Sequence, residues 1–227
     1  MAQSKRIKTL CSLLQKAHTF ADVGCDHGYC SEYMLKNGLC EKVIFSDISK
    51  GSLAKAEKLL AKYIQDGKAQ GVLGDGFFGV PNTTQEVLIA GMGGSEIVSI
   101  LSDTRYGFMP ELFVFQPMHD SEKLRRYLLA QGAVIDRDYT FEDTKFYEVI
   151  VGHKRKENET EQSYTDAEYE FGKENLLCRG EPFLRRIQTL LKNTEKYLAR
   201  ENLQEESRIE LLTKKQRLQG VLSGEIK

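Results

Sequence analysis

Residues 21–29 read Ala21-Asp22-Val23-Gly24-Cys25-Asp26-His27-Gly28-Tyr29, and they lie where a short apolar run, Thr19 to Val23, gives way to a helical pattern. A glycine-bearing turn between a strand and a helix is typical of nucleotide-binding sites, because glycine lets the backbone approach a ligand and the helix amides favour electron-rich groups. The dinucleotide fingerprint Gly-x-Gly-x-x-Gly is not met, since Asp26 stands at its second glycine position. A carboxylate there repels a pyrophosphate and attracts a cationic amino group, such as that of S-adenosylmethionine. Tight packing alone is the alternative explanation for these glycines.

Acidic residues also follow the next two predicted strands. Val43 to Ile48 indicates a buried strand that ends in Asp47, and Gly71 to Gly76 indicates a third strand end that carries Asp75. Parallel strands bring their carboxyl ends to one sheet edge, where open α/β folds bind ligands. We therefore expect Asp47 to accept hydrogen bonds from a ribose, Ile48 to pack on an adenine and Asp75 to accept from the adenine amino group. Alternatively, Asp47 caps a helix over 49–65 and Asp75 is an ordinary turn residue.

The fourth predicted strand, Glu86 to Ala90, runs into Gly91-Met92-Gly93-Gly94. Enzymes that methylate an exocyclic amino group often have Asp or Asn, two prolines and an aromatic residue here, and this chain has neither the acid nor the prolines. A ring nitrogen needs less activation because its own lone pair is nucleophilic, and the glycines leave room for a flat base. Alternatively, they only begin a helix over 95–101.

The fifth predicted strand, Leu112 to Phe115, ends in Gln116-Pro117-Met118. An amide suits the edge of adenine, because it can pair with the amino group and the adjacent ring nitrogen together. Gln116 is therefore a candidate base contact beside the cofactor, or alternatively a surface polar residue before a helix.

The order of these patterns predicts an α/β fold. A helix over 4–18 precedes strands that alternate with helices, and two extended runs, 134–141 and 145–152, form a hairpin at the sheet edge. A seven-stranded, Rossmann-like sheet of this kind fits class I methyltransferases better than nicotinamide dehydrogenases. We expect residues 1–153 to form the cofactor-binding domain. Residues 154–227 are expected to form a helical domain, in which a charged linker over 154–163 precedes two antiparallel, coiled-coil-like helices. These helices are expected to bury two mainly apolar stripes, which comprise Phe183, Ile187, Leu190, Leu191, Thr194, Tyr197 and Leu198 on the first and Leu203, Ile209, Leu212 and Leu218 on the second.

Composition sets limits on function. The formal net charge is −1, from 32 basic and 33 acidic residues, so any nucleic-acid contact must come from local basic patches. The candidate phosphate contacts are Lys5, Arg6, Lys8, Arg125, Arg126, Lys154, Arg155, Lys156, Arg185, Arg186, Lys192 and Lys196. Five scattered cysteines without a Cys-x-x-Cys pair indicate reduced cytosolic thiols and no metal site. No apolar run is long enough to span a membrane, so we expect a cytoplasmic protein, either a monomer or a weak dimer.

Several of these motifs together resemble the bacterial tRNA (adenine-22-N1)-methyltransferases of the transfer-RNA methyltransferase K type. The resemblance rests on Ser4-Lys5-Arg6, residues 22–29, Ala90 to Gly94, Gln116-Pro117 and Glu142-Asp143-x-Lys145-x-Tyr147-Glu148. It implies methylation of adenine N1 in tRNA, with S-adenosylmethionine as cofactor. The chain departs from that pattern at Met118, where we expect Asn, so substrate contacts near this loop are not carried over. Two other functions stay open: methylation of a small molecule or protein, and a catalytically silent, cofactor-sensing RNA-binding module.

These arguments yield one set of candidate site residues. The catalytic candidates are Asp26, Tyr29 and Gln116, and no metal ligands are expected. Asp26 either acts on the base or holds the methionine amino group of the cofactor. The cofactor-binding candidates are Asp22, Gly24, Asp26, His27, Gly28, Asp47, Ile48, Asp75, Gly76, Gly91, Met92 and Gly93.

Overall fold

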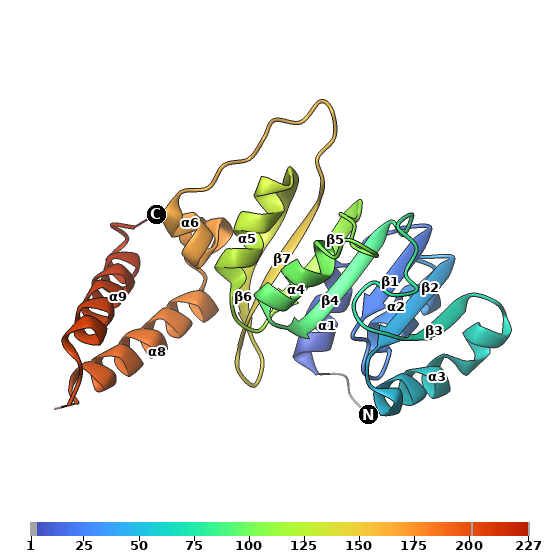
Figure 1. Ribbon diagram of the computed structural model, residues 1–227, viewed down its shortest axis with the longest axis horizontal. Coiled ribbons are helices and arrows are strands. Elements are labelled where there is room, and N and C mark those ends of the chain that lie inside the picture. Colours follow the sequence, from blue (N-terminus) through green and yellow to red (C-terminus); the bar gives the residue numbers. More distant parts are fainter. Residues whose placement is uncertain (1–3, 201, 227) are drawn as a thin grey trace.

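A seven-stranded mixed sheet organises the chain in the computed structural model, which describes residues 4–200 and 202–226. The strand order is β3-β2-β1-β4-β5-β7-β6, with β1 to β5 parallel and β7 antiparallel to β5 (Figure 1). The strands are β1 (Thr19–Val23), β2 (Lys42–Asp47), β3 (Ala69–Leu73), β4 (Glu86–Met92), β5 (Leu112–Pro117), β6 (Ala133–Glu142) and β7 (Phe146–Lys154). The predicted seven-stranded, Rossmann-like sheet and its terminal hairpin are therefore confirmed.

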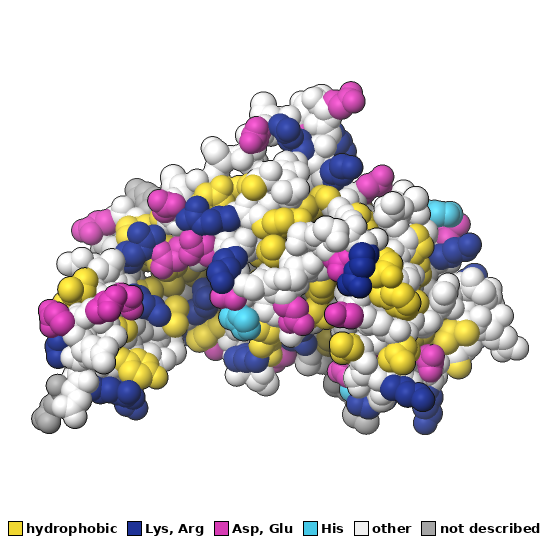
Figure 2. All heavy atoms as spheres, in the orientation of Figure 1, with side chains coloured by type: hydrophobic (Ala, Val, Ile, Leu, Met, Phe, Trp, Pro, Cys, Tyr) yellow, Lys and Arg dark blue, Asp and Glu magenta, His cyan; other side chains and the backbone are white. Residues whose placement is uncertain are grey.

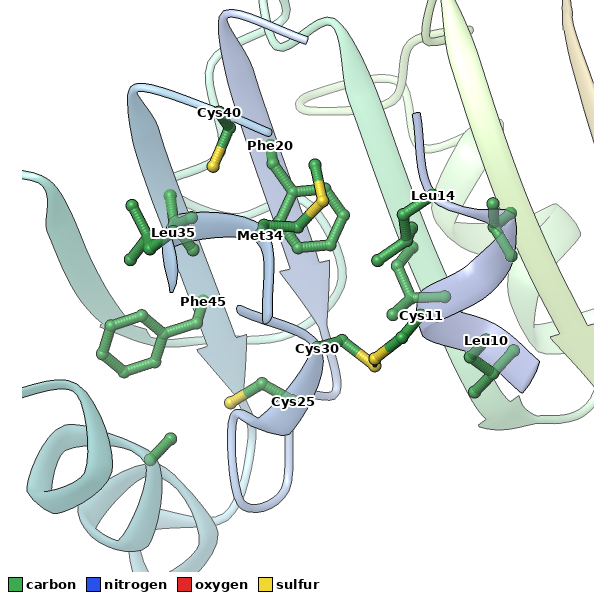
Figure 3. Close-up of a cluster of buried hydrophobic side chains, with 14 of the residues drawn as sticks. Leu10, Cys11, Leu14, Phe20, Cys25, Cys30, Met34, Leu35, Cys40 and Phe45 are labelled. Atoms are coloured by element: carbon green, nitrogen blue, oxygen red, sulfur yellow. The ribbon is translucent and has the colours of Figure 1, made fainter. Parts of the chain in front are cut away.

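Helices cover both faces of this sheet, as the alternation of patterns predicts. One face packs against α1 (Lys5–Leu13), α2 (Tyr29–Lys36) and α3 (Lys50–Gln65), and the other against α4 (Gly94–Leu101) and α5 (Ser121–Ala130). Figure 3 shows part of the first core, where side chains of α1 and α2 meet those of β1 and β2. Central parallel strands are covered on both faces, so they read as continuous apolar runs.

The first helix is shorter than the predicted 4–18. It ends at Leu13, and Leu14 adopts an extended conformation while its side chain stays buried. The chain then runs beside the sheet: the Gln15 amide donates to Glu86 Oε1 at 2.9 Å, and the Ala17 amide donates to the Leu39 carbonyl at 2.9 Å. These tertiary hydrogen bonds replace the last helical turn.

The chain beyond the sheet contains four helices within the described residues, two more than predicted. They are α6 (Asp166–Phe171), α7 (Lys173–Cys178), α8 (Glu181–Leu198) and α9 (Glu205–Ser223). The predicted hairpin corresponds to α8 and α9, which lie side by side at the end of the molecule away from β3 (Figure 1). The charged segment 155–165 has no helix or strand, yet the Gln162 side chain is bound to the backbone of Ile135 at 2.8 and 3.1 Å.

The hairpin is packed mainly at one end. Phe183, Ile187, Leu218 and Val221 form a small core with residues of α6 and α7, in agreement with the predicted apolar stripe on α8. Three other stripe residues were expected to be buried, but they are exposed: Tyr197, Ile209 and Leu212. Among the described elements, the ends of α8 and α9 near their connection lie away from the sheet and its helices (Figure 1). None of the described helices is long and apolar enough to cross a membrane.

A buried ion network joins these helices to the sheet. Arg125 is fully buried and donates to Asp138 at 2.8 and 2.9 Å and to Glu148 at 2.8 Å. Its remaining donor group reaches the carbonyls of Tyr169 and Glu170 in α6. Arg125 is therefore not a phosphate contact, because its guanidinium is inaccessible and fully paired.

Basic and acidic side chains are interspersed over the face of the molecule shown in Figure 2, and other predicted phosphate contacts also have acidic partners. Arg186 donates to Glu148 at 2.7 Å, and Arg185 pairs with Glu142. Arg126 pairs with Glu122 and Asp166 on the surface. Each of these pairs lowers the attraction of the arginine for an RNA phosphate.

We expect Arg125→Ala to lower the free energy of unfolding by about 3–5 kcal/mol, because it leaves the buried carboxylates of Asp138 and Glu148 unpaired. Urea unfolding followed by circular dichroism measures this loss. Arg126→Ala is the matched control, since the adjacent arginine has exposed partners and should change stability much less. Equal unfolding midpoints for the two variants would contradict a structural role of the buried network.

Candidate functional site

A cavity of about 350 Å³ opens at the carboxyl ends of β1, β2, β3 and β4. This is the sheet edge that the sequence predicts for the site. The candidate residues that line it are Asp22, Gly24, Asp26, His27, Tyr29, Asp47, Ile48, Asp75, Gly76, Gly91 and Met92. Three other candidates, Gly28, Gly93 and Gln116, are not among the residues that line it. The fold thus gathers residues from four separate strand ends, and from α1 as well.

The turn after β1 is held in place by Asp47. Its Oδ2 accepts from the Asp26 amide at 3.1 Å, and its Oδ1 accepts from the Ser49 amide at 2.7 Å. The N-cap of α3 is Ser49, whose Oγ accepts from the Ser52 amide, so the alternative in which Asp47 caps this helix is wrong. Each carboxylate oxygen has two acceptor positions, so Asp47 can still bind a ligand.

Two residues of this turn have left-handed backbone conformations. Gly24 has φ +73°, and a Cβ atom there would lie 2.5 Å from Cε of Met92. Asp26 has φ +47°, which is uncommon for a residue other than glycine. Gly28 also has a positive φ, and a Cβ there would meet Ala56 at 3.0 Å. Its role is therefore the close packing of the turn on α3.

Asp26, His27 and Tyr29 form a cluster beside the cavity. The Asp26 carboxylate lies 2.8 Å from Nδ1 of His27, and the rings of His27 and Tyr29 are parallel with centroids 5.5 Å apart. The Asp26 side chain is 66% exposed. It is therefore accessible both to a cofactor in the cavity and to a substrate that arrives from solvent.

Asp22 lines the cavity and is buried. Its Oδ2 accepts from the amide and the hydroxyl of Ser31 at 3.3 and 2.8 Å. The pKa of the Asp22 carboxyl is raised to about 7, mainly by burial; the hydrogen bonds from Ser31 oppose this shift, and the charges of Asp47 and Asp26 add to it. Sequence patterns did not single out Ser31, because its contact with Asp22 depends on the position of α2 against β1.

The cavity is strongly acidic. Its lining contains the carboxyl groups of Asp22, Asp26, Asp47, Asp75 and Glu96. Among the lining residues, all of which the structure describes, Arg6 is the single lysine or arginine. Glu96 was not a candidate, although its place in the first turn of α4 puts it beside the predicted glycine turn. Such a lining favours a ligand with more positive than negative charge.

The glycines after β4 allow two loops to approach each other. A Cβ on Gly93 would lie 2.5 Å from the ring of His119, and one on Gly94 would lie 2.2 Å from the Asp120 carbonyl oxygen. Packing against the β5 loop therefore accounts for these two glycines, which also begin α4.

Gln116 is fully buried, which excludes the alternative of a surface residue. Its Nε2 donates to the Pro117 carbonyl at 3.0 Å, and its Oε1 accepts from Nε of Arg6 at 2.7 Å. The amide is thus occupied on both sides. A direct contact with a base, as the sequence suggested, is not available to it in this arrangement.

Comparisons with known proteins agree with this geometry. Residues 3–150 match the family model described as a methyltransferase domain. The chain is 30% identical over 162 residues to the "Putative tRNA methyltransferase" of Mycoplasma pneumoniae, a match that covers 69% of this chain and 74% of that protein. It is also 30% identical over 153 residues to the tRNA (adenine(22)-N(1))-methyltransferase of Bacillus subtilis, covering 65% and 63% of the two chains.

A solved structure extends the similarity to the helical tail. The crystal structure of Sp1610 of Streptococcus pneumoniae, described as "a putative tRNA (m1A22) methyltransferase", has a TM-score of 0.84 and 25% identity. The match covers 97% of this chain and 100% of that one. A second structure of that protein, at 24% identity and the same TM-score and coverage, is a complex with S-adenosyl-L-methionine.

The raised pKa of Asp22 predicts a pH effect on stability. An unfolded Asp has a pKa of about 3.9, so between about pH 4 and 7 the folded protein holds a proton that the unfolded chain has lost. This group therefore makes stability fall as the pH rises through that range. Asp22→Asn cannot ionise, and its amide oxygen can still accept from Ser31. As the pH rises from 5 to 8, we expect the free energy of unfolding to fall by roughly 2 kcal/mol less in the variant than in the wild type. Urea unfolding at several pH values measures this difference.

Glu86→Gln is the matched control. Burial raises the pKa of Glu86 to about 7 as well, but this residue lies at the opposite end of β4, away from the cavity. Both variants should flatten the pH dependence, whereas only Asp22→Asn should change the affinity for S-adenosylmethionine. A pH dependence identical to the wild type in Asp22→Asn would mean that Asp22 is ionised throughout.

Proposed function

The chain belongs to the methyltransferase family whose domain model spans residues 3–150, and from this premise we propose that it methylates N1 of adenine 22 in tRNA, with S-adenosylmethionine as cofactor. The observation that carries the proposal is the acidic cavity at the strand ends, with its single arginine. The tRNA methyltransferases among the relatives supply the substrate class.

The residues of the cavity fit S-adenosylmethionine. That molecule carries a sulfonium, an ammonium and a carboxylate, so its net charge is positive and complements the acidic lining. The volume of about 350 Å³ lies within the range of small-molecule sites. Ile48 is 74% exposed at the rim, and an adenine ring would cover this apolar side chain. Asp47 would accept from the ribose hydroxyls and Asp75 from the adenine amino group.

The chemistry requires little acid–base assistance. When bound, S-adenosylmethionine supplies an electrophilic methyl group, which adenine N1 takes with its in-plane lone pair, leaving S-adenosylhomocysteine and a positively charged ring. Because N1 carries no proton to remove, the protein's main task is to align the base. The absence of a carboxylate or prolines in Gly91-Met92-Gly93-Gly94 agrees with a ring-nitrogen target.

Asp26 has two possible roles beside the cavity. Its exposed carboxylate would stabilise positive charge that develops on the base, or accept a proton from its amino group. Alternatively it would hold the ammonium group of the cofactor. Tyr29 and His27, with parallel rings, offer a flat surface on which a base turned out of the tRNA can stack.

The helical tail offers basic residues for tRNA. Lys192 and Lys196 are exposed on α8, and neither pairs with an acidic side chain of the described chain. They are therefore better phosphate contacts than Arg185 and Arg186, which pair with Glu142 and Glu148. Backbone contacts of this kind must compensate the cost of a few kcal/mol for unstacking the target adenine.

Nucleoside analysis of tRNA tests the proposed function. Incubation of unmodified tRNA with the protein and S-adenosylmethionine should produce 1-methyladenosine, and a tRNA without adenine at position 22 should stay unmodified. We expect Asp26→Asn to lower single-turnover methylation roughly 10²–10⁴-fold if the carboxylate acts on the base. If it holds the ammonium instead, cofactor affinity should fall and saturating cofactor should restore the rate.

Asp66→Asn, an exposed change at the end of α3, is the control and should leave both quantities unchanged. Methyl transfer to a protein or small molecule but not to tRNA would favour the second enzyme class. Cofactor binding without any transfer would indicate a silent RNA-binding module.

We expect the double variant Lys192→Ala, Lys196→Ala to weaken tRNA binding with no change in cofactor affinity. Each lost phosphate contact should reduce the slope of log affinity against log salt by about 0.7–0.9. Fluorescence anisotropy with labelled tRNA at several salt concentrations measures this slope. Lys55→Ala, Lys58→Ala on the exposed side of α3 is the matched control. An unchanged slope in the α8 variant would rule out these two contacts.

Point variants are preferable to removal of the whole tail. Truncation after residue 154 would delete the Tyr169 and Glu170 carbonyls that satisfy buried Arg125. It would also uncover the sheet-side core, on which Tyr164 and Tyr169 pack.

A further inference from the structure

We propose that Arg6 binds the carboxylate of the cofactor's amino-acid part, and that Gln116 holds the Arg6 guanidinium in the position this requires. The inference rests on the proposed function, because it assumes that the cavity takes S-adenosylmethionine. From the sequence, Arg6 was expected to contact phosphate and Gln116 to contact the base.

Arg6 is fixed at both ends. It lies in the first turn of α1, where its backbone amide donates to Oδ2 of Asp143 at 2.9 Å. Its side chain lies over the ring of Tyr147, 5.5 Å from the ring centroid, and its Nε donates to Gln116 at 2.7 Å. Asp143 is in the turn between β6 and β7, so three distant parts of the chain direct this arginine into the cavity.

The end of the Arg6 side chain is free to bind. A guanidinium has five N–H donors, and Nε uses one of them on Gln116. No acceptor within the described residues 4–200 and 202–226 takes a hydrogen bond from Nη1 or Nη2. Nη2 lies 3.0 Å from the place that a Cβ on Gly91 would occupy. Glycine at the end of β4 thus leaves space for this guanidinium, and not only for a flat base.

Gln116 is built to orient Arg6. The side chain is fully buried at the end of β5, and the bond from Nε2 to the Pro117 carbonyl fixes which way the amide faces. The amide oxygen therefore points at Arg6. A buried amide with both ends satisfied has one favoured orientation, which makes Gln116 a positioning residue.

The charges of the cavity lining indicate which group of the cofactor Arg6 binds. The cofactor's sulfonium and ammonium suit the five acidic side chains of the lining, but its carboxylate would be repelled by them. Arg6 is the one lining residue with a permanent positive charge, and a guanidinium binds carboxylates through two parallel hydrogen bonds. A base-facing role suits Arg6 poorly, because it has no acceptor and its charge would oppose the cationic product ring.

The decisive measurement compares S-adenosylmethionine with its decarboxylated analogue, which lacks this carboxylate. Titration calorimetry on the full chain should show that the wild type binds S-adenosylmethionine more tightly. In Arg6→Ala the affinity for S-adenosylmethionine should fall roughly 10–100-fold, the effect of losing a charge-assisted hydrogen bond, while the analogue binds as before. Arg6→Gln, which keeps most of the side chain, should give the same loss of discrimination and replaces Arg6→Ala if that variant does not fold.

Two further variants distinguish a positioning role of Gln116 from a general structural defect. Gln116→Met has a similar volume but no acceptor for Arg6, so it should lower the ratio of the two affinities without abolishing binding of the analogue. Lys8→Ala removes an exposed cation from the same helix and should leave the ratio unchanged. A structural defect alone would weaken both compounds equally.

The outcomes distinguish this inference from the function on which it rests. If the Arg6 variants keep the wild-type ratio, the carboxylate role is overturned while cofactor binding stands. If they lose tRNA affinity with that ratio intact, Arg6 is a phosphate contact and the inference is again wrong. A wild-type protein that binds neither compound would overturn the proposed function together with the inference.

Discussion

The central position of β1 is the constraint on which the rest of the structure depends. β1 pairs in parallel with β2 on one side and with β4 on the other, so the chain leaves the sheet centre in two directions. The loops that follow these strands diverge and leave a crevice at the carboxyl edge, as open α/β sheets do at such a switch point. Every carboxylate of the cavity, and the glycine turn at residues 24–28, comes from a strand end or helix start at this edge.

This edge concentrates negative charge at a cost to the folded state. Asp22 shows the cost, since burial beside other acidic side chains raises its pKa to about 7. Part of the hydrogen-bonding capacity of Asp47 has a structural role, because its carboxylate accepts hydrogen bonds from the backbone amides of Asp26 and Ser49. A cationic ligand relieves the repulsion between these groups. Arg6 is the exception within the lining, and it is brought in from α1 rather than from a strand end.

Charged side chains attach the helical tail to the sheet, in addition to the apolar packing of Tyr164 and Tyr169 on the sheet-side core. Arg125 and Glu148 lie in the sheet domain, yet they bind the carbonyls of α6 and the guanidinium of Arg186 in α8. Because buried charges tolerate little displacement, this network holds the base of the tail in one orientation. At the far end of the hairpin, where Tyr197, Ile209 and Leu212 are exposed, α8 and α9 pack against each other.

Sequence by itself determined the fold class, the succession of strands and helices along the chain and the residues at the strand ends, because apolar runs, glycines and acids recur with the spacing of a parallel sheet. It predicted Asp47, Asp75 and the turn around Asp26 at one edge, and the structure brings them to one cavity. It did not reveal that α1 ends at Leu13, that Arg125 is buried, or that α6 and α7 precede the hairpin. Those features depend on contacts between residues far apart in the chain. The hydrogen bond between Arg6 and Gln116 joins residues 110 positions apart, so only the tertiary structure could bring Gln116 to the position from which it orients Arg6.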